Sequence, residues 1–253
     1  MSKRTEKTLL VSVLALFALL STTYSVIVPP FEASDELWHY PMVKHIADHW
    51  SLPIQDPANV GPWRQEGSQP PLYYFVGALA TFWIDTSDMA QVRHLNPHVD
   101  NGIATPDGNI NLVAHRPNRE AFPWQGTVLA IQVVRLLSVV MSTAGVLLTY
   151  LVVREVLPYQ PALVLGATAI HAFTPMVAFI AGSVNNDNLV VPLSSLALLL
   201  LLRLLRRRGE TLRQSAYSYL LLGIVLGLAA LTKASSLALT LLTALVVTVR
   251  AVR

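Results

Sequence analysis

The chain has 253 residues, of which 53% are hydrophobic and only 13% are charged, and its mean hydropathy is +0.49. Soluble domains carry about 25% charged residues, so this composition excludes an ordinary soluble protein and indicates an integral membrane protein. The net charge of +3 is small, and the basic residues of the chain cluster between apolar segments, which argues against nucleic acid as a partner. The chain has no cysteine, so disulfide and thiolate chemistry are excluded.

The first apolar run, residues 8–28, follows three basic residues, Lys3, Arg4 and Lys7. It is long enough to cross about 30 Å of hydrocarbon at about 1.5 Å per residue. We therefore predict a membrane span that leaves the N-terminus in the cytoplasm. A cleaved signal peptide is the alternative, but the apolar run continues to Val28, which favours an uncleaved span.

A proline pair and a dense group of polar side chains follow the first span. Pro29 and Pro30 are expected to end its helix, because proline lacks an N–H donor and restricts the residue before it. Ser34 is a favourable N-cap for the next helix, which we predict over residues 35–50. Apolar residues recur at every fourth position there, so we expect this helix to lie in the plane of the membrane interface.

One large outer loop is predicted over residues 29–125. Within it, residues 69–84 are apolar but short for a span, and they contain aromatic residues typical of a membrane interface. We predict a second interfacial helix there, with a span as the alternative. Residues 85–125 are polar and irregular, and loops of more than about 12–15 residues are often functional.

Apolar segments after this loop predict five further spans. The six predicted spans cover residues 8–28, 126–153, 162–181, 189–205, 217–231 and 234–249. Pro175 should kink the third span. The last two should form a hairpin broken at Thr232 and Lys233, with one long helix and a buried lysine as the alternative. The sequence therefore predicts an all-α integral membrane fold with a single domain over residues 1–253.

The basic residues also give an orientation. Arg206, Arg207 and Arg208 lie between the fourth and fifth spans, and such clusters mark the cytoplasmic side of a membrane. With a cytoplasmic N-terminus, the loop 29–125 and the turn 182–188 are then extracytoplasmic. We expect a multi-pass protein of the cell membrane, in contact with membrane lipids, whose active site faces outward.

This topology places several polar side chains at the outer ends of spans. They are Asp35, Glu36, Asp187 and Lys233. Charged groups at membrane depth are costly, so their presence indicates function. The alternatives are structural: a helix cap for the two carboxylates, a turn for residues 185–188, and an interfacial lysine that extends toward water.

Two further features concern buried or paired side chains. Arg135 lies about two turns inside the second predicted span and should pair with a carboxylate or a backbone carbonyl. His45 and His49 stand at i and i+4 and would share one helix face, as metal ligands do. No cysteine and no second ligand pair accompany them, so we assign no metal ligands.

Four motifs in this order resemble those of GT-C glycosyltransferases, the lipid-carrier-dependent enzymes that include protein O-mannosyltransferases and aminoarabinose transferases. They are Pro30–His39, Gln69–Tyr74, Asn185–Asn188 and Leu228–Lys233. Each motif is unspecific by itself, but their order and their shared predicted side make the combination fairly specific. The resemblance covers nearly the whole chain.

The resemblance implies that a hexosyl or pentosyl group moves from a polyprenyl-phosphate donor to a glycan, lipid or protein acceptor. Asp35 would be the general base and Glu36 would orient the acceptor, with inversion at the anomeric carbon. Substrate-binding side chains would be His39, Arg64, Gln69, Tyr73, Asn186, Asp187 and Lys233, with Lys233 at the phosphate and Arg64 and Arg93 sharing that task. Some members use a divalent cation and others do not, so the resemblance implies no definite cofactor.

One departure from the family concerns length. Members have more spans and often a C-terminal domain, so we expect this chain to be an N-terminal portion, with a split gene product or a compact relative as the alternatives. This departure puts in doubt whether the chain is active by itself. The alternative function is a non-catalytic membrane protein, such as a transporter half or an assembly partner. Transporters place ionisable groups near the bilayer midplane and often contain repeats, whereas here the acids fall at predicted span ends and no repeat is apparent.

Overall fold

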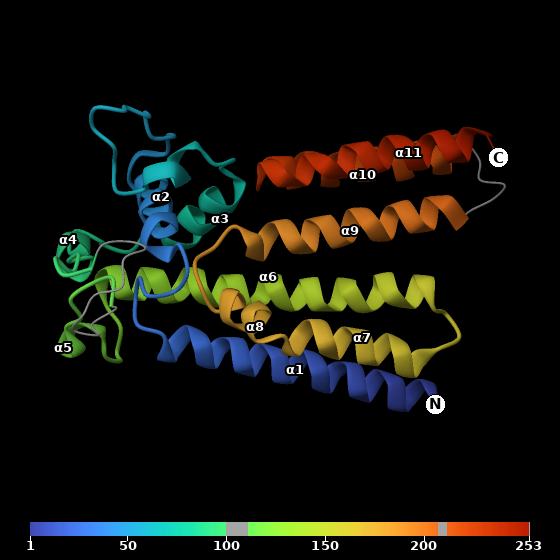
Figure 1. The fold of residues 1–253 in the computed structure, drawn as a ribbon, viewed down its shortest axis with the longest axis horizontal. Helices are drawn as coiled ribbons and strands as arrows, with labels where there is room; N and C mark the ends of the chain where they lie inside the picture. Colours follow the sequence, from blue (N-terminus) through green and yellow to red (C-terminus); the bar gives the residue numbers. More distant parts are fainter. Residues whose placement is uncertain (100–110, 207–211, 253) are drawn as a thin grey trace. The chain divides into compact units, whose positions relative to one another are not determined.

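The computed structural model describes residues 1–99, 111–206 and 212–252, and its regular structure there is helical (Figure 1). The described residues contain one isolated β-bridge, between Leu95 and Val113, and no strand. This confirms the predicted all-α class. Residues 207–211, which include the predicted signals Arg207 and Arg208, lie outside the described residues.

Three helices are long and apolar enough to cross a membrane: α1 (Lys3–Ile27), α6 (Gly126–Val156) and α9 (Asp187–Arg206). A fourth candidate is the pair α7 (Pro161–Phe173) and α8 (Pro175–Ala181), which is bent by 61° at its break. The break lies at the residue before a proline, where helical backbone is disfavoured, so the predicted kink is confirmed.

The last two predicted spans form shorter apolar helices. They correspond to α10 (Leu212–Ala230) and to the 3₁₀ turn η2 (Ala234–Leu237) followed by α11 (Ala238–Val252). Their apolar parts, residues 216–230 and 234–250, are below the length of the three long helices. The total of six spans therefore stays a prediction.

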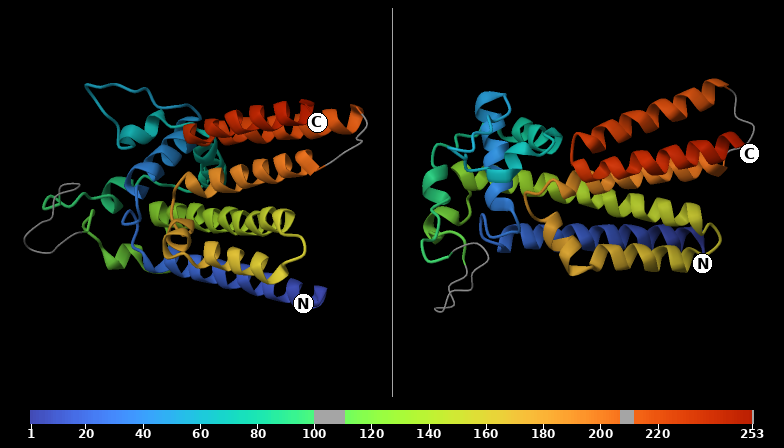
Figure 2. Two further views of the ribbon diagram at one scale, coloured as in Figure 1. Left: turned by 45° about the vertical axis from the view of Figure 1, so that its right-hand side comes forward. Right: turned by 45° about the horizontal axis from the view of Figure 1, so that its top comes forward.

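The chain divides into two compact units, to both of which α1 and α6 contribute. Unit 1 consists of residues 1–20, 139–178 and 186–253. Figures 1 and 2 show α9, α10 and α11 side by side within it, with α10 and α11 as a hairpin rather than one long helix. Its buried contacts join α9 to both partners through Ala197, Leu201, Leu204, Leu222, Val225 and Val246.

Unit 2 consists of residues 21–138 and 179–185. Here α2 (Glu36–His49) packs against α3 (Leu72–Thr81) and against the 3₁₀ turn η1 (Arg64–Ser68). A Cβ at Gly77 would come 3.1 Å from both methyl groups of Val43, so the glycine permits this close packing. The short helices α4 (Met89–Val92) and α5 (Pro117–Glu120) complete the unit.

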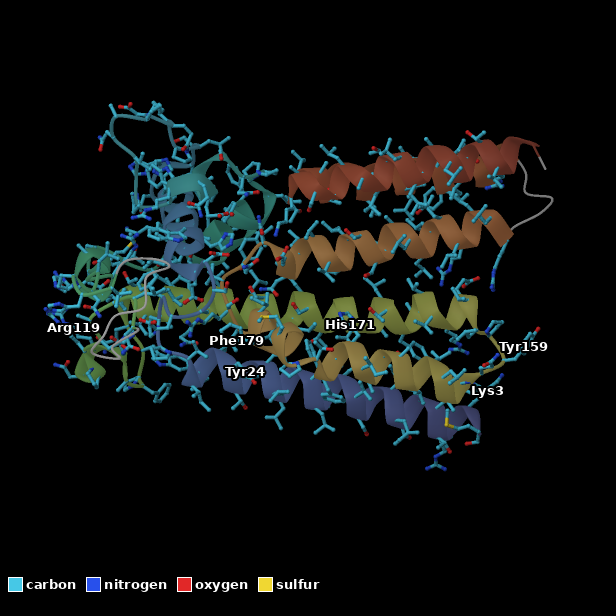
Figure 3. The ribbon with its side chains drawn as sticks, in the orientation of Figure 1. Lys3, Tyr24, Arg119, Tyr159, His171 and Phe179 are labelled. Carbon is cyan, nitrogen blue, oxygen red and sulfur yellow. The ribbon has the colours of Figure 1, made fainter. Side chains whose placement is uncertain are left out.

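The segment 179–185 joins unit 2 because it packs on the end of α1. The rings of Tyr24 and Phe179 meet edge to face at 5.8 Å (Figure 3). A Cβ at Gly182 would lie 2.6 Å from the carbonyl oxygen of Ser21 and 2.9 Å from the amide of Ser25. Only glycine therefore fits this backbone contact without a shift of the chain.

Helices α2 and α3 differ in detail from the predicted segments. The N-cap of α2 is Asp35 rather than Ser34, and its side chain makes no capping hydrogen bond. Helix α3 has ten residues, fewer than the about 20 that a span requires. The predicted place of α2 and α3 in the interface is consistent with these lengths and stays a prediction.

Candidate functional site

The acidic loop between α1 and α2 has an unusual backbone. Phe31 and Asp35 both adopt positive φ angles, 70° and 58°, in the left-handed region that most residues avoid. Aspartate tolerates this region better than a bulky residue such as phenylalanine does. Such a conformation persists only where the surroundings hold it in place, so the contacts of the loop matter.

A buried ion pair holds the loop. The guanidinium of Arg135 in α6 donates to both carboxylate oxygens of Glu36, through Nε to Oε2 at 2.9 Å and through Nη2 to Oε1 at 2.5 Å. Both side chains are fully buried. The remaining oxygen lone pairs accept the amides of Phe31 and Val184, at 3.0 and 2.9 Å. The Glu36 carboxylate therefore has four protein donors.

Arg135 also binds the end of α1. It donates to the carbonyl oxygens of Ser25, Val28 and Pro29 at 2.7 to 3.0 Å. The last carbonyls of a helix have no partner within the helix, and a cation there satisfies them. The predicted pairing of Arg135 with a carboxylate or a carbonyl is confirmed, because it has both.

Asp35 differs from its neighbour Glu36 in exposure. The residue is exposed, its backbone carbonyl accepts the amides of Trp38 and His39, and its side chain makes no capping bond. The loop thus presents one carboxylate to its surroundings while the adjacent carboxylate is held in the interior.

His39 and Tyr73, both predicted substrate-binding residues, lie in buried hydrogen-bond networks. His39 Nδ1 is 2.8 Å from the Tyr74 hydroxyl and 3.3 Å from Glu66. The hydroxyl of Tyr73 bonds to Ser138 at 2.8 Å and accepts the amide of Asn185 at 3.0 Å. These contacts fix α3 against α2, α6 and the segment after α8.

Two arginines gather around one tryptophan in unit 2. The guanidinium carbons of Arg64 and Arg93 lie 4.1 and 5.3 Å from the ring centroid of Trp38. Among the described residues neither arginine has a carboxylate partner. Burial and the charge of Arg64 lower the pKa of Arg93 to about 10.

This arrangement suits an anion. Arg93 donates to the carbonyl oxygens of Leu37 and Pro62, which positions its charge. Two like charges near one ring repel each other, and an anion between them would relieve that repulsion. Gln69, the residue after η1, is half-buried, and its backbone N–H donates to the carbonyl oxygen of Glu66.

A second acid of the loop, Glu32, binds the far end of the long segment between α1 and α6. It accepts the amides of Leu112 and Val113 at 3.0 and 3.1 Å, and it lies 2.9 Å from His115 Nε2. The other ring nitrogen of His115 is 3.0 Å from Glu120. Burial alone would raise the pKa of Glu32, but these hydrogen bonds lower it; the bond to Glu32 raises the pKa of His115.

The predicted residues of unit 1 come together at the start of α9. Lys233 Nζ lies 2.5 Å from Asp187 Oδ1, with the two side chains 30% and 42% exposed. Asn186 is buried, and its side-chain Nδ2 donates to the carbonyl oxygen of Thr232 at 3.5 Å. The turn between α8 and α9 and the break between α10 and η2 therefore meet through polar contacts.

The predicted site residues thus fall into two sets. Unit 2 holds Asp35, Glu36, His39, Arg64, Gln69 and Tyr73, and unit 1 holds Asn186, Asp187 and Lys233. The described residues contain no group of three or more side chains suited to hold a metal ion. His45 and His49 stack on each other at 4.6 Å without a third ligand.

Two features of the candidate site were not predicted from the sequence. The partner of Arg135 was left open, because Glu32, Asp35 and Glu36 all follow the preceding apolar segment and their spacing does not single out Glu36. Trp38 was not connected with the two arginines, because nothing in the spacing of residues 38, 64 and 93 indicates contact.

Comparison with known families shows a match over the second half of the chain. The sequence model of the family described as dolichyl-phosphate-mannose-protein mannosyltransferase matches residues 126–253, slightly more than half of the chain. The matched range contains Arg135, Asp187 and Lys233, and it begins after the acidic loop. No curated protein and no solved structure matches the chain.

Proposed function

The chain belongs to the dolichyl-phosphate-mannose-protein mannosyltransferase family, and from that premise we propose that it transfers a sugar at the outer face of a membrane with Asp35 as general base. Membership indicates a glycosyltransferase that uses a polyprenyl-phosphate sugar donor and a glycan or protein acceptor. Its described helices are those of a membrane protein.

The proposed reaction is a single displacement. The acceptor hydroxyl or amine attacks the anomeric carbon, the bond from that carbon to the phosphate oxygen breaks, and polyprenyl phosphate leaves. Asp35 takes the proton that the acceptor loses. Attack from the face opposite the phosphate inverts the anomeric carbon. No step here requires a metal ion, and none is assigned.

The observation that carries this proposal is the contrast between the two adjacent acids. Asp35 is exposed, and its side chain makes no capping hydrogen bond. Buried bonds of Glu36 to Arg135 and to the amide of Phe31 hold the backbone around it. A general base needs an accessible carboxylate in a fixed position. Because Glu36 is enclosed by four protein donors, we assign it the task of positioning Asp35, which is narrower than the sequence-based expectation that it orients the acceptor.

Cationic groups would act on the phosphate. Lys233 pairs with Asp187, but both side chains are partly exposed, and such pairs are worth only about 0–1 kcal/mol. A phosphate with developing negative charge can therefore compete for the amine, and the released Asp187, with Asn186, would bind sugar hydroxyls. In unit 2, Arg64 and Arg93 lack carboxylate partners among the described residues, so they are the candidates there for binding a phosphate.

His39, Gln69 and Tyr73 keep a substrate role in this proposal through the surfaces they support. His39 and Tyr73 are held in buried networks, so we assign them to the shape of the site more than to direct contact. Gln69 is half-buried beside η1 and is the candidate among the three for a direct hydrogen bond to substrate.

The test is transfer of labelled sugar from a polyprenyl-phosphate donor by purified protein in detergent. Asp35→Asn should lower the rate by about 10²–10⁴-fold, the usual contribution of a general base, with unchanged unfolding behaviour. Asp48→Asn is the matched control, since this acid lies on α2, the helix that begins directly after Asp35, and pairs with Lys44. Added formate should partly restore Asp35→Ala. Full activity of Asp35→Asn would refute the assignment.

A further inference from the structure

A basic cavity lies in unit 1 at the end of α6, beside the end of α9 opposite Asp187. It has a volume of about 340 Å³ and is lined by Leu151, Arg154, Glu155, Pro158, Arg203 and Arg206. Arg154 belongs to the last turn of α6, and the other two arginines belong to the last turn of α9. The lining therefore holds three guanidinium groups and one carboxylate.

The single carboxylate does not satisfy these arginines. Glu155 lies 3.7 Å from Arg203 Nε and 3.6 Å from Arg206 Nη1, both longer than a hydrogen bond. Arg154 donates to the Tyr150 hydroxyl at 3.1 Å and is 3.9 Å from Glu6. The three arginine side chains are 43–52% exposed, so their charge is open to a ligand.

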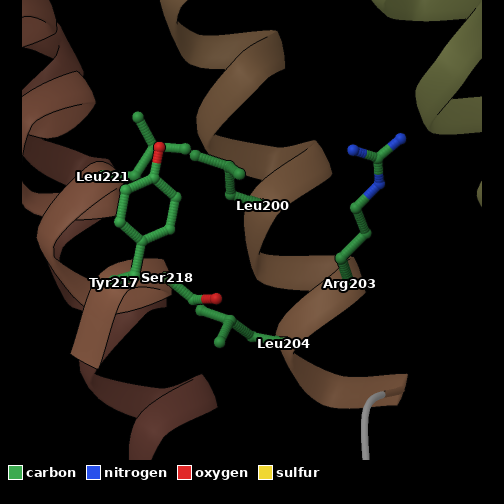
Figure 4. Close-up of a pocket in the computed structure, with 6 residues that line it drawn as sticks. All are labelled: Leu200, Arg203, Leu204, Tyr217, Ser218 and Leu221. Atoms are coloured by element: carbon green, nitrogen blue, oxygen red, sulfur yellow. The ribbon is translucent and has the colours of Figure 1, made fainter. Parts of the chain in front are cut away.

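An apolar pocket adjoins this cavity through a shared residue. Arg203 also lines a pocket of about 150 Å³ between α9 and α10, together with Leu200, Leu204, Tyr217, Ser218 and Leu221 (Figure 4). Figure 4 shows the guanidinium of Arg203 extending away from the tyrosine and leucine side chains. A basic cavity and a leucine-lined pocket thus lie on two sides of one arginine.

We propose that these two pockets bind an anionic phospholipid, with its phosphate among Arg154, Arg203 and Arg206 and an acyl chain against the leucines. Arginine binds phosphate oxygens through paired N–H donors, and basic pockets between membrane helices bind anionic headgroups. A free phosphate would use the cavity alone, whereas a phospholipid uses both pockets. The N-terminus of α1 and the turn after α6 lie at the same end of unit 1, as Lys3 and Tyr159 show in Figure 3.

The experiment measures lipid binding to the full chain in detergent by native mass spectrometry. Phosphatidylglycerol should bind at least ten-fold more tightly than phosphatidylcholine, and glycerol 3-phosphate should bind at least ten-fold more weakly than phosphatidylglycerol. The double variant R203Q/R206Q should weaken phosphatidylglycerol binding roughly thirty-fold, at about five-fold for each arginine.

The matched control removes two charges at the same end outside the cavity. K3Q/R4Q should change the affinity by less than about three-fold, because these side chains do not line either pocket. Equal weakening by both double variants would overturn the proposal, since it would show attraction to the general surface charge. Two other results would overturn it as well: equal affinity for phosphatidylglycerol and phosphatidylcholine, or equal affinity for phosphatidylglycerol and glycerol 3-phosphate.

A variant that is expected to strengthen lipid binding keeps the test decisive if R203Q/R206Q does not fold. Glu155→Gln removes the acid that, among the described residues, competes with the phosphate for Arg203 and Arg206. It should tighten phosphatidylglycerol binding by about five-fold and leave phosphatidylcholine binding unchanged. Unchanged or weaker phosphatidylglycerol binding by Glu155→Gln would refute a phosphate among these arginines.

Discussion

Replacing Arg135 by methionine removes the positive partner of a fully buried carboxylate. Five hydrogen bonds are lost: two to Glu36 and one each to the carbonyls of Ser25, Val28 and Pro29. The carboxylate would keep only two backbone donors and no opposite charge. Breaking a buried pair in this way costs about 3–5 kcal/mol of folding free energy. The equilibrium constant for unfolding should therefore rise by about 10²–10³-fold or more, because a ten-fold change corresponds to about 1.4 kcal/mol.

The assay is a denaturant titration of the purified protein in detergent, followed by tryptophan fluorescence. A double-mutant cycle separates the pair from the packing around it. The variant E36M/R135M lacks the uncompensated charge, so it should be more stable than R135M, with a coupling energy of at least about 2 kcal/mol. Arg135→Lys keeps the charge but cannot make five bonds, so it should lie between wild type and R135M. A loss below about 1 kcal/mol in R135M, or additive effects of the two single changes, would refute the reasoning.

Three further predictions concern other contacts. The lowered pKa of Glu32 stabilises the fold above about pH 4.5, and the raised pKa of His115 does so below about pH 6.5. The stability lost in Glu32→Gln should therefore be largest between these values and shrink toward pH 8.5, and a loss that still grows above about pH 6.5 would contradict this. Gly182→Ala should cost about 1–3 kcal/mol in the same titration, because its Cβ would meet backbone atoms of α1, and an unchanged midpoint would show that the contact is loose. Lys233→Met should lower the rate of sugar transfer by about 10²-fold but the free energy of unfolding by no more than about 1 kcal/mol, since its pair with Asp187 is partly exposed. A loss of stability as large in free energy as the loss of activity would indicate a structural lysine.

Local features of the sequence predicted many of the elements. The predicted segments 126–153 and 189–205 correspond to α6 and α9, and the kink at Pro175 is where α7 ends and α8 begins. The break at Thr232 and Lys233 also lies between two helices. These features depend on hydropathy over a window of residues and on proline geometry, both of which are properties of neighbouring residues.

The N-cap of α2 shows where local reasoning fails. Ser34 and Asp35 are both favourable N-cap residues, so residue type does not decide between them, and the helix begins after Asp35, which has a left-handed conformation. Glu36 accepts the amide of Phe31 and pairs with Arg135, which is 99 residues away in the chain. Tertiary contacts of this kind override the preference of a single residue, and no short window of sequence contains them.

The sequence by itself determined that this chain is a helical membrane protein, which segments are apolar, and which few polar residues require an explanation. Only the tertiary structure decided which acid is buried and which is exposed. Glu36 and Asp35 are adjacent and chemically alike, and they differ because the guanidinium of Arg135 and two backbone amides reach one carboxylate and not the other. Burial of a charge is stable only where distant donors converge on it, and that convergence is a property of the folded chain.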